Sequence, residues 1–387
     1  MFVRSLAFCD RDDEKFCELV AIPRPYRKLV RKLDLKNVLF LIRLEYCHLH
    51  EQVFFNMLIE RFRKMKKPVF AAIMTSFTLF FYAGLCSADD PNHITLTETS
   101  LGYVITIDGK PFAGYRKDFN GTPIIWPVIG PNEKPMTRTY PMMPDVSGET
   151  KDHPHHRSLW FTHDDINGNK HWGGGSVIEH QTFLKTECDG KTATLVTKNH
   201  WLDKQTKAAV LSDVRTVTFG TIDNHRYIDF DIVLTAELDE VTIGDTKEGT
   251  FAVRVPTSMD VDAKKNNPEL GGTIINTQGD KDDKAWGKRS DWVDYSGPVE
   301  GSIAGIAIFN HPASYRYPTW WHVRTYGLFA ANPFGIKDFE PELKEDGTVV
   351  LKKGESLRFY YRIILHIGDA TSLDIGKLYK DYTAVQK

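Results

Sequence analysis

Short runs of alternating apolar and polar residues fill the chain from Asn92 onward, and they predict β-strands with one buried and one solvated face. The run Arg226–Ala236 is the clearest, because Ile228 and Ile232 lie on the face opposite Asp229. The same pattern predicts further strands at residues 94–99, 103–107, 177–187, 193–199, 210–219, 250–255, 302–309, 328–331, 349–351 and 357–367.

Turn signals separate many of these runs, for example the pairs Asn120-Gly121 and Asp189-Gly190. Such pairs tolerate the positive φ angles of tight hairpin turns. A helix is expected only at the tail, over Ser372–Tyr382, where Ser372 or Thr371 would provide the N-cap. Many strands without intervening helices predict an all-β fold, a large antiparallel β-sandwich with a short C-terminal helix.

The segment before this region has a different character. Residues 65–88 begin with Met65 and two lysines, continue as an uncharged apolar run and end in Cys86, Ser87 and Ala88. This order is typical of a secretory signal peptide. The run also approaches the roughly 20 residues that span a bilayer, so a membrane anchor over 68–88 is the alternative.

Residues 1–64 show no domain pattern, and we interpret them as an over-extended gene start or a disordered extension. A cytoplasmic tail in front of a membrane helix is the alternative interpretation. We therefore expect an exported protein, periplasmic or extracellular, in which residues 92–387 form a single all-β domain.

The cysteine count and the charge distribution indicate which bonds and partners to expect. Removal of the leader leaves Cys188 alone, so we expect no internal disulfide in the exported domain. The whole chain has a formal net charge of −2. Residues 1–64 are basic, with 13 Lys and Arg against 9 Asp and Glu, so the rest of the chain is acidic. An acidic domain repels a phosphate backbone, and no glycine-rich phosphate loop is present. We expect no nucleic acid, no nucleotide cofactor and no obligate protein partner.

Candidate chemistry is concentrated in the segment Asp152–Asp165. It holds four of the 14 histidines, together with Arg157 and Trp160. Histidine titrates near neutral pH and is the commonest metal ligand, so such a concentration indicates a functional site.

Six motifs, taken in order, resemble a bacterial family whose members carry the names methane oxygenase PmoA or PmoA family protein. The named enzyme's membrane subunit has several transmembrane helices, whereas this chain has at most one apolar run of that length, so we interpret the name as a transferred label. The β-rich pattern looks like the sandwich of galactose-mutarotase-like proteins, an analogy of fold that implies no specific reaction. The motifs are Asp152–Phe161, Gly244–Gly249, Trp292–Gly297, Ile306–Pro312, Trp321–Arg324 and Ala330–Gly335, and the resemblance spans roughly residues 92–369.

Metal binding is one interpretation of the histidine-rich segment. If the chain is extended there, His153 and His155 point to one face. His163 and Asp165 have the spacing of two members of a two-His-one-carboxylate triad, with a third ligand from elsewhere. These four residues are the candidate ligands of a divalent transition metal.

Acid–base chemistry on a sugar is the other interpretation, and it requires no cofactor. Such chemistry needs a proton donor and a proton acceptor with tuned pKa values. His155 or His156 would pair with a carboxylate, and the resemblance favours Glu248, which lies in the second of the six motifs. We expect Lys247 and Arg254 to hold Glu248 ionised.

Several other side chains are suited to binding a sugar. Tryptophan rings pack against the C–H faces of sugars, and arginine forms bidentate contacts with the carboxylate of a uronic acid. His311 and His322 are also candidates for the third metal ligand. The candidate substrate-binding residues are Arg157, Trp160, Asp165, Arg254, His311, His322 and Arg324.

Other polar residues fit structural roles. His180, His200 and His366 lie within strand patterns, where a hydrogen-bonded structural side chain is the expected role. Asp213 and Arg215, two residues apart on one strand, are expected to form a solvated pair.

We therefore expect a secreted carbohydrate-active protein, an enzyme of the epimerase, lyase or glycoside-cleaving type. It would use His and Glu acid–base chemistry on a carbohydrate or uronate-containing substrate. A non-catalytic glycan-binding module and a metal-dependent oxygenase or hydrolase are the alternatives.

Overall fold

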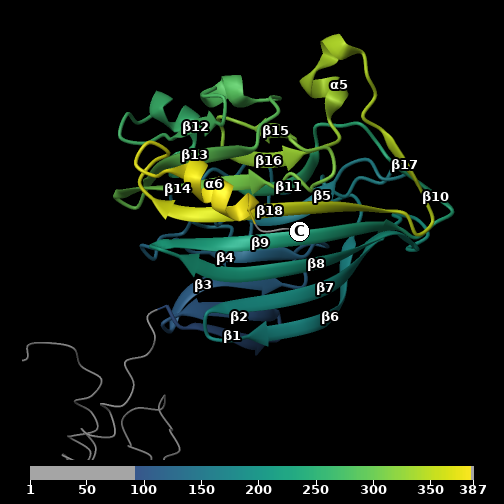
Figure 1. Cartoon of the computed structure of the whole chain (residues 1–387), viewed down its shortest axis with the longest axis horizontal. Helices are drawn as coiled ribbons and strands as arrows, with labels where there is room; N and C mark the ends of the chain where they lie inside the picture. Colours follow the sequence, from purple (N-terminus) through teal and green to yellow (C-terminus); the bar gives the residue numbers. More distant parts are fainter. Residues whose placement is uncertain (1–91, 385–387) are drawn as a thin grey trace, which may run out of the picture. The chain divides into compact units, whose positions relative to one another are not determined.

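The computed structural model describes residues 92–384, so the predicted leader and the extension before it lie outside the described residues. Two eight-stranded sheets and a two-stranded ribbon make up the fold, and every strand pair is antiparallel (Figure 1). In spatial order, the first sheet contains β1 (Ile94–Thr99), β2 (Gly102–Ile107), β3 (Lys110–Arg116), β4 (Ile124–Val128), β5 (Leu159–His163), β11 (Gly249–Arg254), β16 (Leu328–Asn332) and β15 (Trp320–Val323). The second contains β12 (Thr273–Asn276), β13 (Trp292–Val299), β14 (Ser302–Asn310), β18 (Ser356–Ile367), β9 (His225–Ala236), β8 (Ala209–Ile222), β7 (Thr192–Leu202) and β6 (Ile178–Cys188).

The remaining elements are short. The ribbon pairs β10 (Glu240–Ile243) with β17 (Val349–Lys352). The helices are α5 (Ile336–Phe339) and α6 (Ile375–Thr383), and the 3₁₀ turns are η2 (Thr257–Met259), η3 (Val261–Lys265), η4 (Asp282–Ala285) and η5 (Pro341–Leu343). The predicted all-β sandwich with a C-terminal helix is confirmed.

The two large sheets pack face to face over one hydrophobic core. Phe251 of β11 stacks on Tyr361 of β18 with ring centroids 4.5 Å apart, and Phe161 of β5 lies 5.8 Å from Phe359 of β18. Burial of each such aromatic side chain contributes roughly 1.5–3 kcal/mol to stability. Strand β9 shows the predicted alternation along its whole length, with one face in this core.

The centre of the first sheet departs from that alternation. Every residue of β5 and β11 is buried, because the second sheet covers one face and loops cover the other. A strand that is buried on both faces has no polar side to alternate with. The sequence pattern nevertheless predicted β11, whereas it did not predict β5, which lies within the histidine-rich segment.

A polar network lies inside the core and corrects one prediction. Asp213 and Arg215 form a buried ion pair with side chains 0% and 4% exposed, not a solvated pair. Asp213 also accepts hydrogen bonds from Asn199 and Trp201, both at 2.7 Å. The Arg215 guanidinium donates to the Phe161 carbonyl of β5, so the network connects the second sheet to a strand of the first.

Helix α6 lies against the outer side of the second sheet (Figure 1). Its buried residues Ile375, Leu378 and Tyr382 pack with Phe309 and Ile364. The cap differs from the prediction, because the Asp374 side chain accepts the Lys377 amide. Among residues 92–384, no helix has the length and apolar character needed to cross a membrane.

Candidate functional site

The face of the first sheet that points away from the second sheet carries most of the candidate residues. Alternate positions of the central strands project from it, including Trp160 of β5, Ala252 of β11 and Ala330 of β16, which form a buried cluster separate from the main core. Trp172, from the loop between β5 and β6, joins this cluster with its ring 5.1 Å from Trp160. We call this face, with the loops that cover it, the outer face.

The three neighbouring histidines of the candidate segment lie in a turn above the outer face, not in an extended strand. The His156 amide donates to the His153 carbonyl at 2.9 Å, and His153 has a φ of 45°. The expectation that His153 and His155 point to one face of a strand is therefore wrong. The turn instead stacks the His153 ring on His156 at 4.8 Å and sets the His155 ring edge-on to both.

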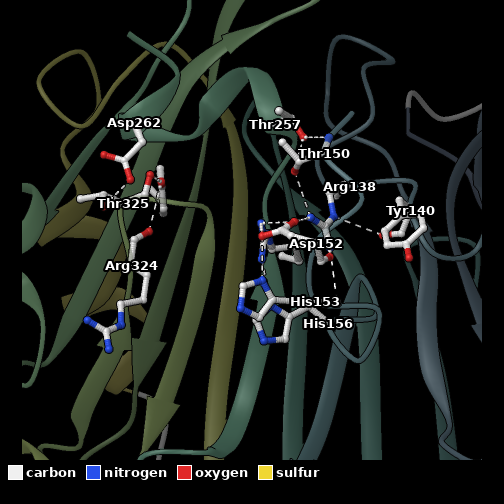
Figure 2. Close-up of polar contacts among 12 residues, drawn as sticks. Arg138, Tyr140, Thr150, Asp152, His153, His156, Thr257, Asp262, Arg324 and Thr325 are labelled. Carbon is white, nitrogen blue, oxygen red and sulfur yellow. Dashed lines mark hydrogen bonds and ion pairs between the residues drawn. The ribbon is translucent and has the colours of Figure 1, made fainter. Parts of the chain in front are cut away.

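Asp152 fixes this turn through two buried arginines (Figure 2). Its carboxylate pairs with Arg138 and with Arg254, whose side chains are 0% and 1% exposed, and accepts a hydrogen bond from His153 at 2.7 Å. Burial raises the pKa of Asp152, but the charge of Arg254 and these hydrogen bonds outweigh it and hold that pKa well below its usual range. Asp152 is therefore a permanent anion that holds the turn in place.

His156 has a defined proton position. Its Nδ1 lies 2.9 Å from an Arg254 guanidinium nitrogen, which can only donate, so Nδ1 accepts and the proton of the neutral ring lies on Nε2. Burial, with the charge of Arg254 next, lowers the pKa of His156 well below its usual value. His156 is therefore a neutral hydrogen-bond donor near neutral pH.

His155 is half-buried and remains accessible from solvent. Burial and the neighbouring His153 lower its pKa to about 4. At neutral pH the ring is therefore uncharged and its unprotonated nitrogen can accept a hydrogen bond or a proton.

Tyr326 is a site residue that the sequence analysis missed. It lies at the tip of the hairpin between β15 and β16, packs against the cluster of Trp160, and stacks on His153 at 5.1 Å. The charge of Glu248 contributes to raising its pKa, after burial, so the two side chains are close enough to interact. Nothing in the local sequence distinguishes this tyrosine, because its position depends on the hairpin.

Glu248 and Asp164 lie opposite each other where β11 and β5 meet. The Asp164 amide donates to the Glu248 carbonyl at 3.0 Å, which extends the strand register by one residue pair. Burial raises the pKa of both carboxyl groups, and the charge of Asp164 adds to the rise at Glu248. Lys247 lies 3.7 Å from Glu248 and lowers its pKa, but this effect does not outweigh that of burial.

Buried polar atoms without partners underlie this set of residues. The indole nitrogens of Trp160 and Trp172, the Thr162 hydroxyl and Nε of Arg254 find no hydrogen-bond partner among residues 92–384. Each of these side chains is at most 3% exposed. An unsatisfied buried polar group costs about 1–3 kcal/mol, so any polar ligand group that reaches one of these atoms would stabilise this face.

His322 and Arg324 lie at the β15 edge of the same face. His322 Nδ1 donates to the Lys247 carbonyl at 2.7 Å, and its Nε2 accepts from Arg324 Nε at 3.2 Å. Burial and the charge of Arg324 lower the pKa of His322 to about 3. His322 therefore positions the residues around it, because both of its nitrogens are occupied.

The structure separates the other candidates from this site. His163 points into the sandwich and donates from Nε2 to the Gly244 carbonyl at 2.8 Å, while Asp165 is exposed and accepts the Gly168 amide in a turn. The expected His163 and Asp165 ligand pair is therefore not formed. Asp165 as a substrate contact is equally unsupported, since its carboxylate holds the turn.

Two further candidates do not contribute a free side chain to the site. His311 follows β14 of the second sheet and packs against Tyr360 and Tyr382, so it does not join the outer face. Arg157 is buried and donates to the Thr122 hydroxyl at 2.6 Å, a contact that holds two loops together.

The predicted metal ligands are not assembled in the part of the chain that the structure describes. Within it, no group of three or more His, Cys, Asp or Glu side chains is arranged to hold a metal ion. His153 and His155 lie close together above the outer face, whereas His163 lies below the sheet and Asp165 lies in an exposed turn.

Comparison with known proteins gives a family and distant structural similarities. A model described as a family of unknown function (DUF6807) matches residues 103–380. No curated protein matches the sequence significantly.

Among solved structures, the GH36 α-galactosidase AgaA from Geobacillus stearothermophilus is 10% identical with a TM-score of 0.33, over 71% of this chain and 40% of the galactosidase. The heparan sulfate lyase HepC from Pedobacter heparinus is 9% identical with a TM-score of 0.33, over 72% of this chain and 36% of the lyase. A galactose mutarotase related enzyme from Lactobacillus acidophilus is 13% identical with a TM-score of 0.24, over 73% of this chain and 97% of the mutarotase-related enzyme. The chain thus spans less than half the length of the first two.

Proposed function

The chain belongs to the DUF6807 family of unknown function, and we propose that it binds a carbohydrate at the outer face and acts on it by acid–base chemistry. The observation that carries the proposal is the layered arrangement of that face. Half-buried titratable and aromatic side chains, His155, Tyr326 and Glu248, lie above buried donors that have no hydrogen-bond partner among residues 92–384.

A sugar suits such a face for two reasons. Its hydroxyl groups both donate and accept hydrogen bonds, so they offer partners for the indole nitrogens of Trp160 and Trp172 and for the Thr162 hydroxyl. Its C–H groups pack against aromatic rings, which Tyr326 and the neighbouring histidines provide.

Two groups are suited to the proton transfers. Glu248 has a raised pKa, so it retains a proton to higher pH than an ordinary carboxyl group and suits the role of general acid. His155, with its pKa lowered to about 4, is unprotonated at neutral pH and is the group we assign as general base, because it is the solvent-accessible histidine of the turn. His156 stays neutral and has an Nε2 proton that can be donated to a sugar hydroxyl. The reaction we propose is proton transfer at a glycosidic oxygen or at a sugar carbon.

The proposal is tested by screening the full-length chain against a glycan panel, with product detected by mass spectrometry. Glu248→Gln is expected to lower turnover by about 10²–10⁴-fold, because it removes the transferable proton while preserving shape. Glu342→Gln, a change of the same kind on the exposed turn η5, is the matched control and is expected to leave turnover unchanged.

Each outcome of this test is decisive. Full turnover by Glu248→Gln would contradict the acid–base assignment. Binding of a glycan without any product would contradict catalysis and support a glycan-binding module instead.

Two predictions from the sequence accompany this proposal. We propose that the protein acts outside the cytoplasm, since residues 65–88 have the pattern of a signal peptide. The proposed reaction includes no oxygenation step, although the chain resembles proteins named methane oxygenase. It uses only acid–base side chains of this chain.

A further inference from the structure

Arg324 lies on the same outer face as the proposed acid–base groups, and we infer that it binds the carboxylate of a uronic acid residue in the ligand. The inference rests on the proposed function, because it names the class of sugar that the same face would take. The half-buried side chain of Arg324 follows β15 on the outer face and directly precedes the hairpin tip that carries Tyr326.

Two neighbours hold the Arg324 guanidinium from different sides. Its Nε donates to His322, whose other nitrogen donates to the Lys247 carbonyl, one residue before Glu248. Its guanidinium carbon lies 4.8 Å from the centroid of the Trp286 ring. The planar group is therefore held at a fixed orientation near the proposed general acid.

The hairpin that carries Arg324 is itself anchored. The Tyr295 hydroxyl, from the second sheet, lies 3.3 Å from the Arg324 carbonyl, and Thr325 donates to Asp262 at 2.9 Å. Figure 2 shows the Arg324 side chain extending away from Asp262, in the direction in which the rings of His153 and His156 point. A group held in this way loses little conformational freedom when it binds an anion.

The other arginines predicted to bind a carboxylate are already engaged. Arg254 donates to His156 and to both oxygens of Asp152, and Arg157 is buried against Thr122. No carboxylate among residues 92–384 forms an ion pair with Arg324, and its two terminal nitrogens have no hydrogen-bond partner within that range. These two nitrogens form the planar fork that matches a carboxylate.

The inference predicts selectivity that a general sugar site would lack. A carboxylate bound by this fork gains charge-assisted hydrogen bonds, which a neutral sugar cannot form. We expect the full-length chain to bind a uronate oligosaccharide at least about tenfold more tightly than the same oligosaccharide with its carboxyl groups reduced to alcohols.

Calorimetric titration with such matched pairs tests this expectation. The probes are oligogalacturonate, oligoglucuronate and oligomannuronate, each with its carboxyl-reduced counterpart, together with a sulfated neutral oligosaccharide. Arg324→Gln is expected to remove the preference for uronate, and Arg324→Lys is expected to retain a part of it, because lysine keeps the charge without the fork.

The control variant is Arg358→Gln, whose arginine pairs with Asp231 on the second sheet, and it is expected to retain the full preference. Equal binding of uronate and reduced sugars would overturn the inference but leave the proposed function standing. Binding of the sulfated sugar in place of uronates would also overturn it. Failure of every sugar to bind would contradict the proposed function, and the inference with it.

Discussion

Replacing Asp213 by alanine tests how the core supports the strand below the site. The Asp213 carboxylate accepts four hydrogen bonds of 2.7–2.8 Å, from Asn199, from Trp201 and from two nitrogens of Arg215. The substitution leaves the Arg215 charge buried at 4% exposure without its counter-ion. Breaking such a pair costs about 3–5 kcal/mol, because the remaining charge is not compensated.

Equilibrium unfolding of the full-length chain in urea measures this loss. The matched control is Asp231→Ala, which breaks an exposed ion pair with Arg358 and is expected to cost less than about 1 kcal/mol. A double change, Asp213→Leu with Arg215→Met, is expected to cost less than Asp213→Ala, since it removes both charges. If Asp213→Ala is no more destabilising than Asp231→Ala, the role given to the buried network is refuted.

Two further predictions concern stability. Burial lowers the pKa of His163 and His171 to about 4. Between pH 6.5 and 4 the unfolded chain therefore binds protons that the folded chain does not. As the pH is lowered through this range, the free energy of unfolding decreases by about 1.4 kcal/mol per pH unit for each ring. Urea unfolding at pH 7 and 5 measures how steeply the free energy of unfolding depends on pH. If His171→Asn leaves this dependence unchanged, the lowered pKa assigned to His171 is contradicted. Gly249→Ala is expected to lower stability by about 1–3 kcal/mol, because the new Cβ lies 2.4 Å from His163 Nδ1. Gly376→Ala, with its nearest neighbour at 3.5 Å, is the control in thermal unfolding, and equal melting temperatures would contradict the expected clash.

The sequence predicted strands β7, β8 and β9 of the second sheet because their outer side is largely polar. Strand β9 alternates strictly, and its observed bounds differ from the prediction by one residue. Among the central strands of the first sheet, β11 and β16 were predicted although both are fully buried. Strand β5, whose outer side is covered by loops, was not predicted, although the residues before it were recognised as functional candidates.

The candidate site was predicted in part for a similar reason. Local density of histidine was a sufficient signal for His155 and His156, and the family resemblance favoured Glu248. Tyr326 carries no local signal, because only the pairing of β15 with β16 brings it to the outer face. Asp164 lies in the candidate segment but was not singled out, because its place opposite Glu248 depends on the pairing of β5 with β11. His163 and Asp165 were grouped by spacing along the chain, but the strand directs one inward and the turn directs the other to solvent.

The central claim is that the outer face binds a carbohydrate. The most direct measurement is a crystal structure of the full-length chain with the glycan that binds most tightly in the titrations. The account predicts a sugar in contact with Tyr326, His155 and Glu248, with hydroxyl groups directed toward the donors of Trp160 and Thr162 that lack partners among the described residues. A sugar bound on the second sheet, or contacting none of these residues, would contradict it.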